Sequence, residues 1–134
     1  MSPQEQEMLR MVNQARRQAG VPPVAPDQRL NQVAWRKAQD ILRNGYWSHY
    51  SPTYGSPADM VRAAGVAFSW VSENLARAPD VVQAFQGFMN SPNHRANILY
   101  PHHRLVGLAV AEYQQWGRRW VLVVQEFVTP PGVR

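Results

Sequence analysis

The sequence predicts an α/β (α+β) domain built as a three-layer α/β/α sandwich, with a small antiparallel sheet flanked by helices. Two observations lead to this prediction. The runs 105–113 and 120–128 have strand character yet carry apolar residues on both faces, which is typical of strands covered on both sides. Capped, amphipathic helical segments precede these strands and can supply the two covering layers.

Length and composition indicate one folded domain spanning residues 1–134. Hydrophobic residues make up 45% of the chain and charged residues 17%, which excludes a disordered protein. No apolar run is long enough to span a membrane, and residues 1–7 are not a signal peptide, so we expect an intracellular protein or a mature secreted domain. The absence of cysteine excludes disulfides, thiolate metal sites and cysteine nucleophiles.

The formal net charge is +5, and arginine carries almost all of the positive charge because Lys37 is the single lysine. The basic residues are scattered, apart from two Arg-Arg pairs, whereas a nucleic-acid-binding protein usually clusters them on one face. We therefore expect no specific nucleic-acid partner. A general attraction to polyanions is expected, which includes cell-wall polymers and lipid headgroups.

The N-terminal third predicts two helices that pack on the core. Ser2 to Glu5 has the form of a capping box, and Gly20 ends the first helix. Residues 21–26 predict a stiff linker, because a proline-rich segment cannot continue a helix. Asp27 caps the second helix, which ends at Asn44-Gly45.

The remaining elements are shorter. We expect, in order, a helix starting at Ser56-Pro57, a strand over 67–76, a helix over 79–89, a short helix over 91–99, and the strands 105–113 and 120–128 joined by a loop over 114–119. The hydroxyl of Ser91 is expected to cap the helix over 91–99 by accepting a bond from a free backbone amide.

Three side chains are candidates for a site. His49 lies in an aromatic-rich loop, Glu73 lies on an otherwise apolar strand face, and His94 lies in the capped helix over 91–99. Two imidazoles and a carboxylate can hold zinc with an open position or move protons. They can equally serve only to tie a strand to two other segments. His102 and His103 are expected to be solvated loop residues that point apart.

The order of three motifs resembles the bacterial, SCP-like branch of the CAP superfamily, which includes cysteine-rich secretory proteins, antigen 5 and plant pathogenesis-related 1 proteins. The motifs are Gly45-Tyr46-Trp47-Ser48-His49, then Ser72-Glu73-Asn74-Leu75, then Ser91-Pro92-Asn93-His94-Arg95-Ala96-Asn97-Ile98-Leu99. The likeness extends from about Met8 to Phe127 and includes Val12-Asn13-x-x-Arg16. It implies an α/β/α fold and a location outside the cytoplasm, in the cell envelope or the medium.

The resemblance also implies a cleft lined by two histidines and usually two acids. Some relatives hold zinc or another divalent metal ion there. By motif, His49 and His94 match the histidines and Glu73 matches one acid, so these three are the expected metal ligands and candidate catalytic residues. Relatives often carry the second acid a few residues after the first histidine, where this chain has Thr53-Tyr54-Gly55. The residues expected to line a ligand cleft are Tyr46, Trp47, Tyr50, Tyr54 and Asn74.

Three functions remain open at this point. The first is a secreted, non-enzymatic domain that binds a lipid, a peptide or an anionic cell-wall component. The second is a metal-dependent, peptidase-like hydrolase with zinc on His49 and His94 and with Glu73 as general base. The third, from charge alone, is nucleic-acid binding.

Overall fold

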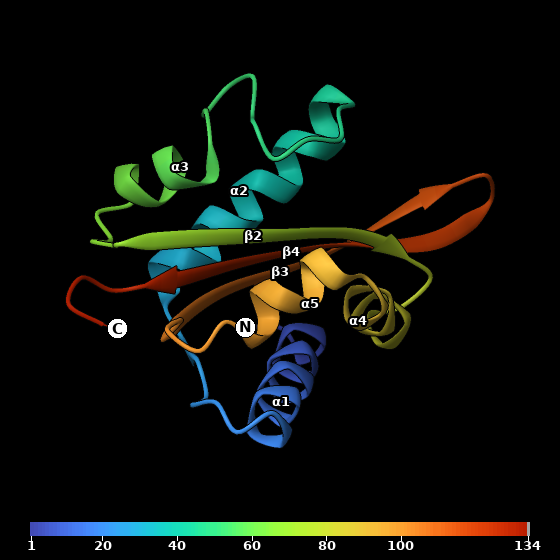
Figure 1. Cartoon of the computed structure of the whole chain (residues 1–134). Helices are drawn as coiled ribbons and strands as arrows, with labels where there is room; N and C mark the ends of the chain where they lie inside the picture. The colour runs from blue at the N-terminus through green and yellow to red at the C-terminus, as the bar shows by residue number, and fades with distance from the viewer. Residues whose placement is uncertain (134) are drawn as a thin grey trace.

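The computed structural model describes residues 1–133 and has three layers (Figure 1). Helices α2 and α3 cover one face of a four-stranded sheet, and helices α1, α4 and α5 cover the other. The predicted three-layer α/β/α sandwich is therefore confirmed. The elements are α1 (Pro3–Gln18), β1 (Ala25–Pro26), α2 (Gln28–Asn44), α3 (Pro57–Ala63), β2 (Trp70–Ala78), α4 (Val81–Asn90), α5 (Pro92–Leu99), β3 (Leu105–Gln115) and β4 (Arg118–Thr129).

The sheet is mixed, whereas the sequence predicted a purely antiparallel one. Its strand order is β1-β3-β4-β2, and the three long strands are antiparallel neighbours. Strand β1 pairs with β3 in parallel, within the segment predicted to be only a linker. The amides of Ala25 and Asp27 donate to β3 and the residue before it, so Pro26, which has no N–H, is tolerated at the sheet edge.

Both faces of the long strands are buried, as their apolar pattern predicted. The core under α1, α4 and α5 includes Met8, Val12, Phe88, Ile98, Val110, Val123 and Phe127. The core under α2 and α3 includes Leu30, Ala34, Ile41, Met60, Ala109, Leu122 and Val128. Gly107 of β3 lies so close to α2 that only glycine fits there. A Cβ built at this position would be 2.1 Å from the backbone oxygen of Leu30.

Local signals set the helix ends, and one hairpin differs from its prediction. Ser2 forms the predicted capping box with Glu5, and Gly45 ends α2 at a φ of 65°. The β3–β4 connection is shorter than the predicted loop over 114–119. Trp116 and Gly117 both have positive φ, 53° and 71°, which permits a tight turn and lets the strands pair up to its edge. Among the described helices, none has the length and apolarity needed to cross a membrane.

Arg16 of α1 clamps this helix to the segment that follows α5. Its side chain is fully buried and donates to the carbonyl oxygens of Ile98, Tyr100 and His103 at 2.8, 2.9 and 3.0 Å. A fourth bond of 2.7 Å reaches the carbonyl of Pro22. Burial lowers the pKa of Arg16 to about 10, which still leaves it protonated at neutral pH. These hydrogen bonds hold α1 against the C-terminal end of α5, which is the end farther from His94.

Candidate functional site

His49 and Glu73, two of the predicted site residues, are in direct contact. His49 Nδ1 lies 2.8 Å from Glu73 Oε1. The imidazole side chain is 59% exposed, whereas the carboxylate side chain is 1% exposed. The hydrogen bond to Glu73 raises the pKa of His49, against the opposing effect of burial. The acid therefore lies beneath an accessible ring and fixes its orientation.

Helix α2 anchors the loop that carries His49. Asp40 accepts hydrogen bonds from the hydroxyls of Tyr46, Ser51 and Thr53 at 2.5, 2.5 and 3.1 Å. One helical turn earlier, Lys37 Nζ donates to the backbone oxygen of His49 at 2.7 Å. Neither anchor was predicted from the sequence. The sequence feature that could have revealed them is the presence of two charged residues on the buried side of α2, which otherwise carries apolar residues.

A second buried acid, which sequence reasoning also missed, lies beside Glu73. Glu126 of β4 pairs in register with Glu73 of β2, so both side chains lie on the same face of the sheet. Glu126 is fully buried, and neither its carboxyl oxygens nor Glu73 Oε2 have a hydrogen-bond partner among residues 1–133. Burial and the neighbouring charge of Glu73 raise the pKa of Glu126 well above its usual value, which favours a protonated carboxyl.

The second carboxyl near Glu73 comes from β4 and not from the segment after His49. The chain has Thr53-Tyr54-Gly55 at the expected place, and the structure instead supplies a second carboxyl from β4. The fully buried Lys37 lies near this pair: burial lowers its pKa, while the charges of Glu73, Glu126 and Asp40 raise it. The signal for Glu126 was the same as for Glu73, a carboxyl group in an otherwise apolar strand.

His94 of α5 is held by Ser91, but not in the predicted way. Ser91 makes no side-chain capping bond to a backbone amide. Its hydroxyl instead lies 2.7 Å from His94 Nδ1, so the same side chain orients the imidazole. Burial, and then the charge of His49, lower the pKa of His94. In the described part of the chain, the Nε2 atoms of both rings make no hydrogen bond.

Asn74 joins β2 to α5 beneath the surface. Its side chain is fully buried, and its Nδ2 donates to the backbone oxygen of His94 and to Gln125 Oε1, both at 3.0 Å. Its Oδ1 accepts from Asn97 Nδ2 at 2.8 Å. Asn74 therefore positions the helix of His94 from below and does not present its amide at the surface.

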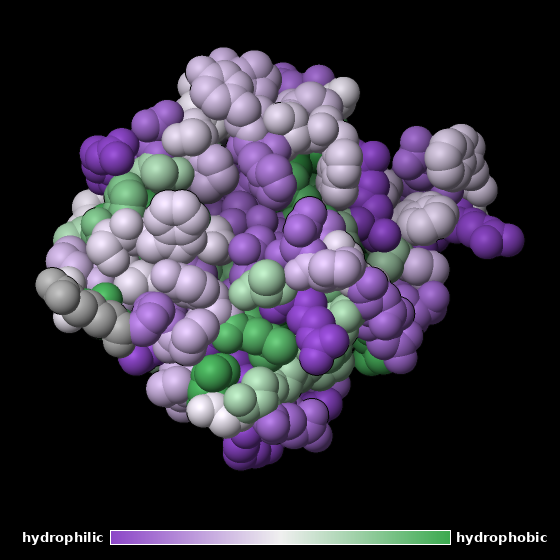
Figure 2. Space-filling model, viewed as in Figure 1, coloured by the Kyte–Doolittle hydropathy of each residue, from purple (hydrophilic) through white to green (hydrophobic). Residues whose placement is uncertain are grey.

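The aromatic residues predicted to line a ligand cleft are distributed around the His49 loop. Tyr46 and Trp47 line a depression at the end of α2, and Tyr54 lies over the guanidinium of Arg36 at 5.7 Å. Tyr50 is 64% exposed. Figure 2 shows that the front face is mostly hydrophilic or neutral, with only small hydrophobic areas. Three of these rings contact a cationic side chain, namely Tyr46 with Lys37, Trp47 with Arg77 and Tyr54 with Arg36.

His103 corrects a prediction, because it is fully buried although a solvated position was expected. Its Nε2 lies 3.0 Å from Ser72 Oγ and its Nδ1 lies 2.9 Å from Thr129 Oγ1. Burial, together with nearby cationic groups, lowers the pKa of His103 to about 3. This imidazole is a neutral link between strands, whereas its neighbour His102 packs against Tyr100 and is half-buried.

The donors available to a metal ion are the two imidazoles. Glu73 Oε1 already contacts His49 Nδ1, which is the position of an outer partner that orients a ligating ring. Residues 1–133 contain no cluster of three or more His, Cys, Asp or Glu side chains arranged to hold a metal ion. A catalytic zinc site normally has three protein ligands, so the two-histidine set does not match one.

Comparisons with known proteins agree with this architecture. Residues 9–127 match the model of the cysteine-rich secretory protein family, CAP. The uncharacterised protein YkwD of Bacillus subtilis (strain 168) is 33% identical over 129 residues, which cover 96% of this chain and 48% of YkwD. The chain thus spans about half the length of this curated relative.

Solved structures show the same fold. An extracellular protein containing an SCP domain from Bacillus anthracis str. Ames superposes with a TM-score of 0.81 and 30% identity, over 96% of this chain and 44% of that one. An outer surface protein from Borrelia burgdorferi gives a TM-score of 0.80 at 16% identity, over 93% and 91% of the two chains. The family match, the relative and the shared fold together establish that this chain belongs to the cysteine-rich secretory protein (CAP) family.

Proposed function

We propose that this chain is a secreted or cell-envelope CAP domain that binds an anionic cell-wall component without catalysing a reaction on it. Its relatives include a protein described as extracellular and another described as an outer surface protein, which supports the location. The net charge of +5 favours an anionic polymer over an uncharged lipid or a peptide. His49 and His94, with their free Nε2 atoms, would contribute polar contacts to the ligand.

The observation that carries the proposal is the burial of Glu73 beneath His49. A general base must come within hydrogen-bond distance of the water that it activates. The Glu73 side chain is 1% exposed, and its Oε1 is occupied by the imidazole. Glu126, the second acid, is buried more deeply still. This arrangement supports recognition by the two rings and argues against the alternative, a hydrolase with Glu73 as base.

In this proposal a divalent metal ion is bound by the two imidazole rings and takes no part in a reaction. His49 and His94 would bind a divalent ion through imidazole nitrogen, and Glu73 would orient His49. Titration of the chelator-treated protein with Zn²⁺ should shift the ring signals of both residues in NMR spectra. His94→Gln should abolish the shift at His49 as well, whereas His102→Gln, in a nearby loop, should not. Separate, independent responses of the two rings would contradict a shared ion.

Binding is tested by co-sedimentation with purified peptidoglycan sacculi. We expect the wild type to sediment with sacculi, and the His49→Gln and His94→Gln variants to be retained less than His102→Gln. Retention on phosphatidylglycerol vesicles but not on sacculi would replace the cell-wall ligand by a lipid. Release of soluble fragments from the sacculi by the wild type, abolished in His49→Gln, would overturn the non-enzymatic proposal.

A further inference from the structure

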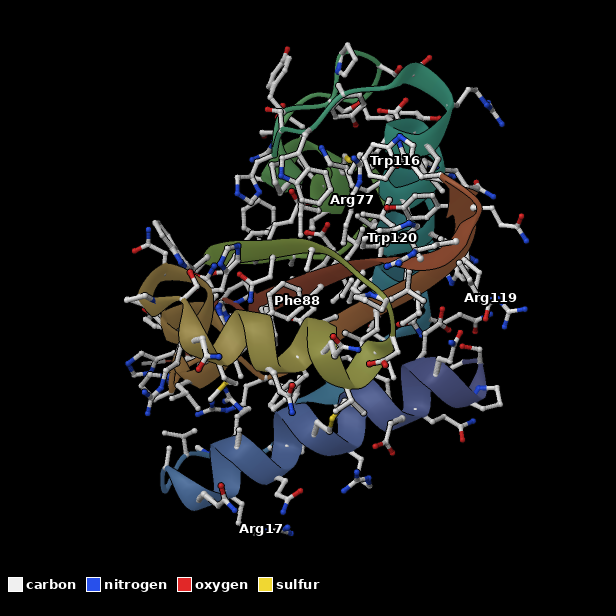
Figure 3. All side chains as sticks on the ribbon, turned by 90° about the vertical axis from the view of Figure 1, so that its right-hand side faces the viewer. Arg17, Arg77, Phe88, Trp116, Arg119 and Trp120 are labelled. Carbon is white, nitrogen blue, oxygen red and sulfur yellow. The ribbon has the colours of Figure 1, made fainter. Side chains whose placement is uncertain are left out.

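The structure contains a depression at the end of α2 that is separate from the His49–Glu73 contact. Its volume is about 460 Å³, which falls within the usual range for small-ligand sites. Its lining includes Tyr46, Trp47, Arg77, Tyr113, Gln114 and Gln115. Figure 3 shows Arg77, Trp116 and Trp120 on the α2 side of the sheet.

The depression exists because α2 ends before the strands do. Gly45 terminates α2, while β3 and β4 continue to the turn at Trp116. Ala111 packs under α2, and Tyr113, two residues further on, lies on the same face of β3 and lines the depression with Ile41, Leu42 and Gly45 from the end of the helix. Arg77 follows Leu75 in the same way on β2. Aromatic and polar side chains therefore stand where another helical turn would have covered the sheet.

Arg77 is held by two aromatic rings and, within the described residues, has no acidic partner. Its guanidinium carbon lies 4.7 Å from the centroid of Trp47 and 5.9 Å from that of Tyr113. Arg10, Arg29 and Arg62 each pair with an acid, whereas Arg77 does not. Among residues 1–133, no acid or hydrogen-bond acceptor engages Arg77. Its N–H donors thus remain available to a ligand, in the geometry that binds carboxylates in bidentate fashion.

We propose that this depression, the Arg77 pocket, binds a carboxylate-bearing sugar of a cell-wall polymer. The carboxylate pairs with Arg77, the apolar face of the sugar ring packs on Trp47 and Tyr113, and the amides of Gln114 and Gln115 bond to hydroxyls. The inference rests on the proposed function, since it names the anionic group through which the polymer is recognised. A phosphate on a sugar could use the same guanidinium, so the test separates the two anions.

The experiment compares three soluble probes by NMR, observing the indole N–H of Trp47. N-acetylmuramic acid carries the carboxylate, N-acetylglucosamine has the same ring without it, and N-acetylglucosamine 1-phosphate carries a phosphate instead. We expect the Trp47 signal to shift with N-acetylmuramic acid, and the affinity to exceed that of N-acetylglucosamine by at least about tenfold, because a charge-assisted pair is lost with the neutral sugar. Equal responses to these two sugars would overturn the proposal, and a response to the phosphate alone would overturn the carboxylate assignment.

Arg77→Gln removes the charge at an exposed position and should lower the affinity for N-acetylmuramic acid at least about tenfold. Arg36→Gln is the matched control, because Arg36 also stacks on a tyrosine without an acidic partner, but outside the pocket. An unchanged affinity of Arg77→Gln for N-acetylmuramic acid would overturn the proposal that the carboxylate pairs with Arg77. If Arg77→Gln binds N-acetylmuramic acid as tightly as the wild type does, while the wild type sediments with sacculi, the pocket assignment is wrong and the proposed function stands. If the wild type does not sediment, the proposed function itself fails.

Discussion

Glu126 lies in register with Glu73 on the neighbouring strand, and both carboxyls are buried, with that of Glu73 in contact with His49. Two ionised carboxylates side by side in a buried setting would repel strongly, so one of them must hold a proton. The raised pKa of Glu126, caused first by its burial, identifies it as the protonated partner. Its proton can then be donated to Glu73 Oε2, which leaves the charge of Glu73 directed to His49.

Glu126→Gln should therefore be nearly neutral for stability. The amide replaces a protonated carboxyl of the same shape and, like it, offers a donor to Glu73 Oε2, so the free energy of unfolding at pH 7 should change by less than about 1 kcal/mol. Glu126→Leu offers no donor to this buried oxygen, which should cost about 1–3 kcal/mol. Urea unfolding measures both variants. A larger loss in Glu126→Gln than in Glu126→Leu would contradict a protonated Glu126.

Glu73→Gln should lower the pKa of His49. The hydrogen bond to the ionised carboxylate is the largest cause of the raised pKa, and an amide oxygen accepts the bond without the charge. An NMR titration of the His49 ring in the presence of a chelator measures the midpoint. Glu112→Gln, on an exposed part of β3, should leave the midpoint unchanged. An identical midpoint in Glu73→Gln and wild type would mean that Glu73 does not stabilise the protonated ring.

The layers and the His49–Glu73 contact could be predicted because they follow from local patterns and from motif order. Strands apolar on both faces require two covering layers, and a carboxylate on such a strand requires a partner. The partnership of Glu73 with Glu126 could not be predicted in the same way. It depends on the register between β2 and β4, which are far apart in the chain and whose pairing has no local signal.

Two other features could not be predicted because the local sequence does not decide which partner a side chain takes. The hydroxyl of Ser91 can bond a backbone amide or an imidazole, and only the position of His94 relative to α5 decides between them. His103 looked like a solvated loop residue, since its burial is produced by Ser72 and Thr129 from two different strands. In both cases tertiary contacts override the local preference.

His103 should make the protein sensitive to acid. Its pKa is about 3 in the folded protein, below the ordinary value of 6.5 that applies when the chain is unfolded. Above pH 6.5 the ring is neutral in both states, and as the pH falls towards 3 only the unfolded state gains the proton, so stability is lost at about 1.4 kcal/mol per pH unit.

Urea unfolding at pH 7 and pH 4.5 measures this linkage. Wild type should lose about 2–3 kcal/mol more than His103→Gln between these two pH values, because the variant has no proton to gain at this position. The absolute stability of His103→Gln does not enter the comparison. His102→Gln should keep the wild-type dependence on pH. Equal losses in wild type and His103→Gln would show that His103 does not remain neutral in the folded state.

Gly107→Ala should be strongly destabilising. The added Cβ would lie 2.1 Å from the backbone oxygen and 2.2 Å from the backbone carbon of Leu30, and backbone atoms cannot rotate away as a side chain does. Helix α2, which carries Lys37 and Asp40, would have to move from β3, so we expect a loss of about 3 kcal/mol or more in the free energy of unfolding.

Gly87→Ala, in α4, is the matched control for this substitution. A Cβ at Gly87 meets no atom within 4 Å, so alanine should stabilise the helix by about 0.5–1 kcal/mol. The displacement of α2 should also loosen the loop of His49, since Lys37 Nζ holds its backbone oxygen. The NMR midpoint of His49 should therefore shift in Gly107→Ala and not in Gly87→Ala. Equal stability of the two variants would mean that α2 does not rest on β3 at Gly107.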